Sequence, residues 1–198
     1  MMLLVQVIYY DGIMSQPVIV KYRKVEKKNT LFLDRDGVLN EVVMRGNEIS
    51  SPRNIDEIVI AKDLIYLGEQ KIIENWNLIL ISNQPDLSRG LISKKFIELV
   101  NEKIMRFAPI NAAYICPHVR EDICKCRKPK IGLLERYNED FPYVKGKSYM
   151  IGDRKADQLF AKNGGIDFIL KKQPHNFNLF EKLPNAINNF SELNNFLR

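Results

Sequence analysis

Five short apolar runs alternate with segments of helical periodicity, and this alternation restricts the possible folds more than any other feature of the chain. The runs cover residues 31–33, 78–81, 112–115, 149–151 and 168–170. Strand and helix in repetition are typical of a parallel sheet that is covered on both faces. We therefore predict an α/β fold with a mostly parallel sheet and helices on both faces. At 198 residues the chain can bury one full core.

Helical periodicity is clearest between residues 93 and 107, where Ser93 is a suitable N-cap. The apolar residues that recur on one face of this segment are Phe96, Ile97, Val100 and Ile104. Further helices are expected at 64–75 and 156–163, and Gly164-Gly165 supplies a stop for the second of them.

The first 29 residues differ in character from the rest of the chain. Apolar segments at 5–10 and 18–22 flank Asp11-Gly12, and a charged connector follows. This pattern predicts two strands that form either an added hairpin or a loosely held arm. We therefore divide the chain into an N-terminal extension, residues 1–29, and one principal domain, residues 30–198.

Charge and the apolar N-terminus bear on location and partners. The net charge is +6, but residues 1–29 carry +3 of it, which leaves few cations for a groove that follows a nucleic-acid backbone. The apolar start is short, lacks a basic leading region and runs into Asp11, which argues against a signal peptide or membrane span. We expect a cytoplasmic monomer that binds a small phosphorylated molecule, without a nucleic-acid or membrane partner.

Two carboxylates stand at the end of the first apolar run. Asp34 and Asp36 follow it directly, and Gly37 permits a sharp turn after them. Side chains at i and i+2 of an extended segment lie on the same side, so both carboxylates can share one reacting centre at the edge where open α/β sheets bind ligands. One carboxylate can then attack while the other carries a proton. The alternative is an acidic strand end that only faces solvent.

Polar residues also follow the next two runs. Ser82 and Asn83 end the second run, where a hydroxyl and backbone N–H groups can hold phosphoryl oxygens. Arg127 and Lys128 come after the third run and can neutralise charge that develops during phosphoryl transfer. Each signal alone also fits a helix cap or a solvated lysine, but together they favour a phosphoryl-transfer site.

The fourth run ends in Gly152-Asp153-Arg154. Asp153 would complete a hard oxygen site for Mg²⁺ beside Asp34, and Asp157 lies one turn further on. The alternative is a turn residue that binds nothing. The position of these residues at successive strand ends favours the metal site.

Together these residues resemble the four motifs of the haloacid dehalogenase (HAD) superfamily of aspartate-nucleophile phosphatases. The resemblance covers about residues 30–170. It rests on Asp34-Arg35-Asp36-Gly37, Ser82, Lys128 and Gly152-Asp153-Arg154. It implies a Rossmann-like, HAD-type sheet in which Asp34 attacks phosphorus to form an acyl-phosphate. Asp36 would protonate the leaving alkoxide and then activate water.

The same resemblance implies a catalytic Mg²⁺ held by Asp34, Asp153 and the backbone carbonyl of Asp36. Lys128 and Ser82 would stabilise the transferring group. This chemistry needs Asp34 ionised while Asp36 carries a proton, so we expect their surroundings to move the two pKa values apart.

All three cysteines and one of the two histidines form a CxH pair and a CxC pair between residues 116 and 126. The four candidate ligands are Cys116, His118, Cys124 and Cys126. Four sulfur and nitrogen donors leave no open coordination position, which is typical of a structural Zn²⁺. A disulfide would leave an odd thiol. Because the loop ends at Arg127-Lys128, the metal would position these cations.

Cys-Pro-His followed by Cys-x-Cys-Arg-Lys-Pro is similar to the zinc loop of one branch of this superfamily. That branch contains D-glycero-D-manno-heptose 1,7-bisphosphate phosphatases and histidinol-phosphate phosphatases. The resemblance implies little or no cap domain and a substrate contact for Arg127. Asn83, Arg89 and Arg127 are our predicted substrate-binding residues.

The loop at residues 82–90 is similar to the heptose type because Arg89-Gly90 closes it. Two guanidinium groups, from Arg89 and Arg127, suit a second phosphate on a sugar. The short zinc loop and Arg154 are closer to the histidinol type. We therefore predict a heptose 1,7-bisphosphate 7-phosphatase, with histidinol-phosphate phosphatase as the alternative.

Two functions outside catalysis also fit parts of the sequence. A zinc-containing nucleic-acid module would explain the basic charge, but no helix rich in Lys and Arg follows the cysteines. A regulatory relative without activity would be expected to lack the nucleophile or the acid, and both are present. His175 has no partner that the sequence identifies, and we interpret it as a surface residue.

Overall fold

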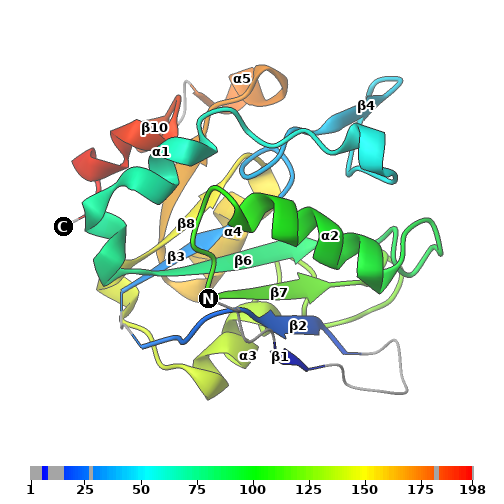
Figure 1. Cartoon of the computed structure of the whole chain (residues 1–198), viewed down its shortest axis with the longest axis horizontal. Helices are drawn as coiled ribbons and strands as arrows, with labels where there is room; N and C mark the ends of the chain where they lie inside the picture. Colours follow the sequence, from blue (N-terminus) through cyan, green and yellow to red (C-terminus); the bar gives the residue numbers. More distant parts are fainter. Residues whose placement is uncertain (1–5, 9–15, 27–28, 181–182, 198) are drawn as a thin grey trace.

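A central sheet flanked by helices organises the molecule (Figure 1). The structure is a computed structural model that describes residues 6–8, 16–26, 29–180 and 183–197. The eight strands of the sheet are, in spatial order, β1 (Gln6–Ile8), β2 (Val18–Lys21), β7 (Ala112–Cys116), β6 (Asn77–Asn83), β3 (Thr30–Leu33), β8 (Ser148–Gly152), β9 (Asp167–Lys171) and β10 (Ala186–Ile187). The helices are α1 (Leu64–Glu69), α2 (Lys94–Met105), α3 (Gly132–Asp140), α4 (Lys155–Gly164) and α5 (Phe177–Phe180).

Strand order places β3 at the centre of the sheet. It pairs in parallel with β6 on one side and with β8 on the other. In spatial order, the six strands β7, β6, β3, β8, β9 and β10 are all parallel. The chain first builds β6 and β7 on one side of β3 and then β8, β9 and β10 on the other. Such a reversal opens a crevice at the carboxyl ends of the strands. The five predicted strands are confirmed, each slightly longer than expected.

The N-terminal extension continues this sheet. Strands β1 and β2 are antiparallel, as expected for a hairpin, and β2 also pairs antiparallel with β7. Val18, Ile19 and Val20 are buried, so the alternative of a loosely held arm is wrong for β2. The turn predicted at Asp11-Gly12 lies outside the described residues.

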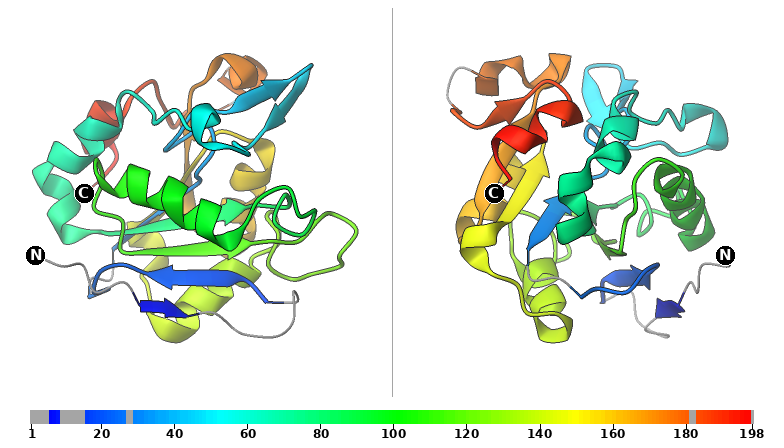
Figure 2. Two further views of the ribbon diagram at one scale, coloured as in Figure 1. Left: turned by 45° about the vertical axis from the view of Figure 1, so that its right-hand side comes forward. Right: turned by 60° about the vertical axis from the view of Figure 1, so that its left-hand side comes forward.

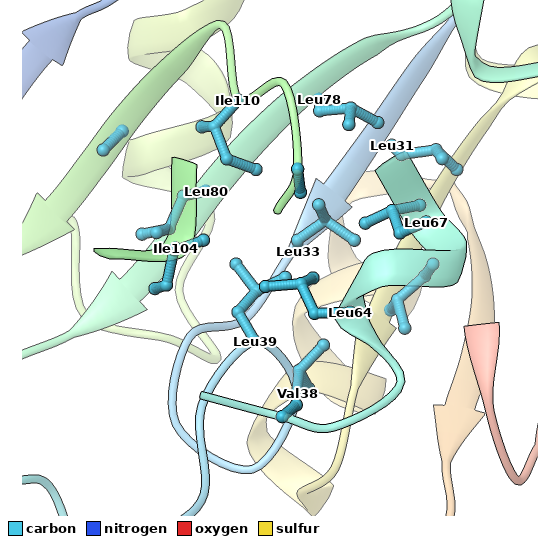
Figure 3. Packing of buried hydrophobic residues seen from close by; sticks show 14 of the residues in the cluster. Leu31, Leu33, Val38, Leu39, Leu64, Leu67, Leu78, Leu80, Ile104 and Ile110 are labelled. Atoms are coloured by element: carbon cyan, nitrogen blue, oxygen red, sulfur yellow. The ribbon is translucent and has the colours of Figure 1, made fainter. Parts of the chain in front are cut away.

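Each face of the sheet is covered by its own helices. Helices α1 and α2 lie on one face and α3 and α4 on the other (Figures 1 and 2). Leu31 and Leu33 of β3 pack on the first side, whereas Phe32 points to the second, because strand side chains alternate. Figure 3 shows the first core, in which Leu31, Leu33, Leu78 and Leu80 of the sheet meet Leu64 and Leu67 of α1 and Ile104 of α2.

Two of the three predicted helices match the structure closely. At α2, the Ser93 hydroxyl accepts a hydrogen bond of 3.1 Å from the Phe96 N–H, as expected for the N-cap. Helix α4 ends at Gly164 and is capped by Gly165, whose φ of 66° lies in the left-handed region. None of the helices in the described part of the chain combines the length and apolarity needed to cross a membrane.

The expectation of one continuous helix over residues 64–75 is wrong. Helix α1 ends at Glu69, Gln70 is extended, and a 3₁₀ turn, η2 (Lys71–Asn75), follows. The break is stabilised by the Gln70 side chain, which donates hydrogen bonds to the backbone carbonyls of Tyr66 and Phe190.

A small hairpin that we did not predict follows β3. Strands β4 (Val43–Arg45) and β5 (Glu48–Ser50) pair antiparallel across a turn at Gly46, whose φ is 61°. Arg45 forms an ion pair of 2.6 Å with Glu57 in the 3₁₀ turn η1 (Ile55–Glu57), which ties the hairpin to the domain. The hairpin stands above the main sheet in Figure 1 and lines one side of the cleft described next.

Candidate active site

A cleft of about 730 Å³ lies where the carboxyl ends of β3 and β6 meet the loop that follows β7. The predicted residues that line it are Asp34, Asp36, Ser82, Asn83, Arg89, Arg127 and Lys128. Asp153 follows β8 and adjoins the cleft, with a carboxylate oxygen within 4.8 Å of one from Asp34. The fold therefore brings together residues that are up to 119 positions apart, since Asp34 and Asp153 meet.

Asp34 is a buried carboxylate between one cation and two other acids. Its Oδ1 lies 2.9 Å from the Lys128 Nζ and accepts a hydrogen bond of 2.7 Å from the Arg35 backbone N–H. Burial and the nearby Asp157 raise the pKa of Asp34 to about 6, although Lys128 acts in the opposite direction. The site is therefore short of positive charge at this carboxylate.

Asp36 has the opposite surroundings. Its oxygens accept hydrogen bonds of 2.9 Å from Asn40, 2.7 Å from Ser51 and 2.7 Å from Gln84. Burial raises the pKa of Asp36, but the Arg35 guanidinium and these hydrogen bonds outweigh burial and hold the pKa below its usual value.

The predicted order of the two pKa values is therefore wrong for the protein alone. We expected an ionised Asp34 and a protonated Asp36, and the residues give Asp34 the raised pKa and Asp36 the lowered one. Both carboxylates are buried, but the donors around Asp36 outweigh burial, whereas at Asp34 burial and Asp157 outweigh Lys128. A divalent cation beside Asp34 would favour its carboxylate form, whereas protonation of Asp36 would need the negative charge of a bound phosphate ester.

Lys128 is the cation at the base of the cleft. Its Nζ lies 2.6 Å from Asp157 and 2.9 Å from Asp34, and it donates to the Ile81 carbonyl. Burial lowers the pKa of Lys128, but the two carboxylates outweigh it, so the side chain stays charged. Asn83 holds the Lys128 backbone from both ends, accepting from its N–H at 3.0 Å and donating to its carbonyl at 3.1 Å.

Ser82 lies at the end of β6 and is almost fully buried. Its hydroxyl oxygen accepts a hydrogen bond of 2.9 Å from the Gln84 side chain, which also bonds Asp36. The hydroxyl hydrogen can therefore point to a ligand in the cleft. Ser82 is thus linked through Gln84 to Asp36, and its role in holding a phosphoryl oxygen stays a prediction.

Three acids form a group that can hold a hard cation. Asp34, Asp153 and Asp157 each place an oxygen within 4.8 Å of the others. The Oδ1 atom of Asp153 is buried and has no hydrogen-bond partner among the described residues, which is the state expected of a ligand atom. Oxygen donors of this kind are those that Mg²⁺ prefers, so the residues fit the predicted ion.

Close backbone approach shapes this acidic group. Gly37 has a φ of 88°, and a Cβ atom built there would lie 2.1 Å from the Asp153 Oδ2. A Cβ atom at Gly152 would lie 2.3 Å from the Asp157 Cβ. Both positions therefore require glycine, for space in each case and for conformation at Gly37.

The four predicted zinc ligands meet in one cluster. The Cys116 Sγ lies 3.1 Å from the Cys126 Sγ and 3.8 Å from the Cys124 Sγ, and the His118 Nδ1 lies 3.1 Å from the Cys126 Sγ. Bonds of about 2.3 Å from Zn²⁺ to sulfur place tetrahedral ligand atoms roughly 3.8 Å apart, so small shifts suffice to bind the ion. The hydrogen bond from Cys126 lowers the pKa of Cys116 to about 6, which supplies the thiolate that zinc binds.

Arginines surround the outer part of the cleft. Arg89 and Arg53 both bind the buried Asp86, at 2.9 Å and 2.7 Å, so a carboxylate fixes the Arg89 guanidinium while the side chain stays half exposed. Arg127 donates to the His118 carbonyl within the loop of the Cys/His cluster. Arg154 also lines the cleft, and its Nε atom has no hydrogen-bond partner in the described part of the chain.

The interpretation of His175 as a surface residue is wrong. Its side chain is only 13% exposed, and its Nε2 lies 2.6 Å from the Asp153 Oδ2. Sequence reasoning also missed Asn40, Ser51 and Gln84 as partners of Asp36. No sequence motif marks Asn40, Ser51 or Gln84. Of the three, Gln84 is the one that directly follows a predicted site residue, Asn83.

Comparisons with known proteins agree with this geometry. A family model described as HAD-hyrolase-like matches residues 125–173. The chain is 32% identical over 147 residues to the "Probable D-glycero-D-manno-heptose-1,7-bisphosphate 7-phosphatase" of Thermoplasma volcanium, and the match covers 71% of this chain and 97% of that protein. It is also 32% identical over 160 residues to the "Histidine biosynthesis bifunctional protein HisB" of Legionella pneumophila. That match covers 77% of this chain but 44% of the longer HisB protein.

A solved structure shares the fold. The D,D-heptose 1,7-bisphosphate phosphatase from B. bronchiseptica, complexed with magnesium and phosphate, matches with a TM-score of 0.69 at 21% identity, over 82% of this chain and 94% of that one. Given the match along nearly the whole Thermoplasma protein, the chain belongs to the HAD-type phosphatases, in the branch that contains the heptose-bisphosphate phosphatases.

Proposed function

We propose that this protein is a Mg²⁺-dependent phosphatase whose substrate is D-glycero-D-manno-heptose 1,7-bisphosphate, cleaved at the 7-phosphate through an aspartyl-phosphate. The observation that carries the proposal is the meeting of Asp34, Asp36 and Lys128 at one cleft, beside the acid group of Asp153 and Asp157. Relatives named for this substrate add support.

The residues divide the reaction between them. An Asp34 oxygen attacks phosphorus, the bond from phosphorus to the sugar oxygen breaks, and Asp36 gives its proton to that oxygen. Asp36 then takes a proton from water, which attacks the same phosphorus and releases inorganic phosphate and free Asp34. Lys128 and the Ser82 hydroxyl hold the phosphoryl oxygens throughout. A bound Mg²⁺, held by Asp34, Asp153 and the Asp36 carbonyl, would supply positive charge against the repulsion between carboxylate and phosphate.

The zinc cluster has a structural role in this proposal. Its four protein donors leave no position for a substrate or water. Cys126 stands two residues before Lys128, and Arg127 bonds the His118 carbonyl, so a Zn²⁺ ion would fix both cations of the loop. The ion would thus hold Lys128 in place, although Lys128 lies in a loop and not on a helix or strand.

The outer arginines support a substrate with two phosphates. Arg89 is held by Asp86, and Arg127 lines the cleft beside the zinc loop. A guanidinium whose orientation is already fixed loses little freedom on binding a phosphate. Arg89 and Arg127 together suit the phosphate that is not cleaved, and we assign them the role of binding it.

Histidinol phosphate is the second candidate substrate. Glu48 of the β4–β5 hairpin lines the cleft and is exposed, so a carboxylate is available for a cationic amine. The match to the HisB protein and the presence of Arg154 also favour it. Histidinol phosphate has no second phosphate for Arg89 to bind. The effect of replacing Arg89 therefore distinguishes the two candidate substrates.

Phosphate release tests the proposal directly. Purified protein with Mg²⁺ is given the heptose bisphosphate and histidinol phosphate in parallel, and inorganic phosphate is measured. We expect kcat/KM for the bisphosphate to exceed that for histidinol phosphate by at least tenfold. The reverse preference would replace our substrate with the alternative, and no release from either would overturn both.

The variant Arg89→Ala separates the candidates by mechanism. We expect it to raise KM for the bisphosphate by about 10- to 100-fold, because a charged hydrogen bond contributes roughly 1.5–3 kcal/mol. Arg106→Ala is the matched control, since Arg106 is exposed and does not line the cleft. An equal loss with histidinol phosphate would show that Arg89 supports the loop and does not bind a second phosphate.

A further inference from the structure

We propose that His175 is a positioning residue, which through its contact with Asp153 turns one oxygen of that carboxylate toward the cation site shared with Asp34. The inference rests on the proposed function, since it presumes that a divalent cation binds there. It assigns a role to a segment beyond the motifs of the superfamily.

The two oxygens of Asp153 have different surroundings. Its side chain is fully buried, and its Oδ2 lies 2.6 Å from the His175 Nε2. Its Oδ1 is buried without a hydrogen-bond partner among the described residues, and one oxygen of this carboxylate lies within 4.8 Å of oxygens from Asp34 and Asp157. The torsion that turns an aspartate carboxylate is broad, so an isolated side chain would not hold this orientation by itself.

Gly37 closes the same side as His175. A Cβ atom there would lie 2.1 Å from Oδ2, which shows how closely the Gly37 backbone approaches that oxygen. Oδ2 therefore faces His175, Gly37 and, at 3.8 Å, the Arg154 Nε, and Oδ1 is the oxygen left for a cation. Carboxylate ligands are commonly oriented in this way by hydrogen bonds from outside the ligand set.

The segment that carries His175 is tied to the site on both sides. It is a short turn, η4 (Pro174–Asn176), after β9. Gln173 donates a hydrogen bond of 2.9 Å to the Gly37 carbonyl, and Asn176 donates one of 2.7 Å to the Asp153 carbonyl. The position of His175 is thus set by the two loops that supply the nucleophile and the metal ligand.

Replacement of the donor tests the inference. His175→Leu keeps much of the volume without a donor, whereas His175→Gln can still donate to Asp153. Asn178→Ala is the control, because Asn178 is exposed on the following helix. Binding of Mn²⁺, used as the probe of the Mg²⁺ site, is measured by electron paramagnetic resonance on the full chain, together with the Mg²⁺ dependence of phosphate release.

We expect His175→Leu to weaken Mn²⁺ binding by about 10- to 100-fold, the usual effect of losing an outer partner of a metal ligand. Saturating Mg²⁺ should restore most of kcat, and His175→Gln should bind Mn²⁺ almost as well as the unaltered protein. A purely structural role would lower the melting temperature without this split between metal affinity and kcat. His175→Ala repeats the test if the leucine variant does not fold.

Two results would overturn the inference: unchanged Mn²⁺ affinity in a folded His175→Leu protein, or no Mn²⁺ binding by the unaltered chain. Failure of the proposed function is a separate result. A chain whose Mn²⁺ affinity depends on His175 but which hydrolyses neither substrate would overturn the function and leave this inference standing.

Discussion

We expect Asp34→Asn to lower kcat for phosphate release by about 10⁴-fold or more, the scale on which removal of a nucleophile acts. An amide cannot form the aspartyl-phosphate, and the two nearest candidates among the described carboxylates are already engaged. Asp36 is surrounded by donors, and Asp157 is paired with Lys128. The fold should survive, because burial and Asp157 already raise the pKa of Asp34, so its loss of charge relieves a repulsion.

The control for this variant is Asp56→Asn, the same change at an exposed position outside the cleft. Thermal unfolding of both proteins checks the fold. Acid quenching during turnover of substrate labelled with ³²P should leave label on the unaltered protein and none on Asp34→Asn. Retention of more than a hundredth of the activity, or of the covalent label, would place the nucleophile elsewhere.

Loss of zinc should have the second largest effect. We expect Cys126→Ser to remove bound Zn²⁺, lower activity by about 100-fold or more and lower the free energy of unfolding by several kcal/mol, since metal binding is coupled to local folding. For a chain of this length, each kcal/mol lowers the melting temperature by roughly 2–4 °C. The activity falls because Lys128 loses its place between Asp34 and Asp157.

Ile123→Ser is the matched control for the cysteine change. Ile123 lies in the same loop, but its side chain is 93% exposed and outside the ligand cluster. Metal content by mass spectrometry should give close to one Zn²⁺ per chain in the control and almost none in Cys126→Ser. Full activity in a zinc-free protein would contradict the positioning role of the metal.

The parts of the site that the sequence predicted share a local signal. Each apolar run ends at a strand end, so Asp34, Ser82 and Asp153 could be placed at one edge before any contact was known. The cysteines and His118 could be assigned because ligand spacing within one loop already matches the coordination shell of zinc. In these cases the local sequence pattern was sufficient to predict the site, together with the rule that ligands bind at the carboxyl ends of parallel strands.

The parts that were missed depend on contacts across the fold. Ser51 directly follows the β4–β5 hairpin and meets Asp36, 15 positions earlier, only because the hairpin brings the chain back to the loop after β3. His175 reaches Asp153 across 22 positions through a turn with no helical or strand period. The pKa order that we expected for the two carboxylates was also missed, because burial and Asp157 raise the pKa of Asp34 while Arg35, Asn40, Ser51 and Gln84 hold down that of Asp36, and a sequence does not state which groups face which acid.

Strand β2 also covers the edge of β7, the strand that leads into the loop of the Cys/His cluster. It pairs with residues 112–115 of β7, whose five residues are all buried and whose last residue, Cys116, follows the paired segment. Removal of residues 1–21 would leave β7 as an exposed edge strand, whose free backbone groups could pair with strands of neighbouring molecules. Self-association would then begin beside Cys116, the first residue of the Cys/His cluster, so we expect removal of the N-terminal hairpin to disturb the loop that carries Lys128.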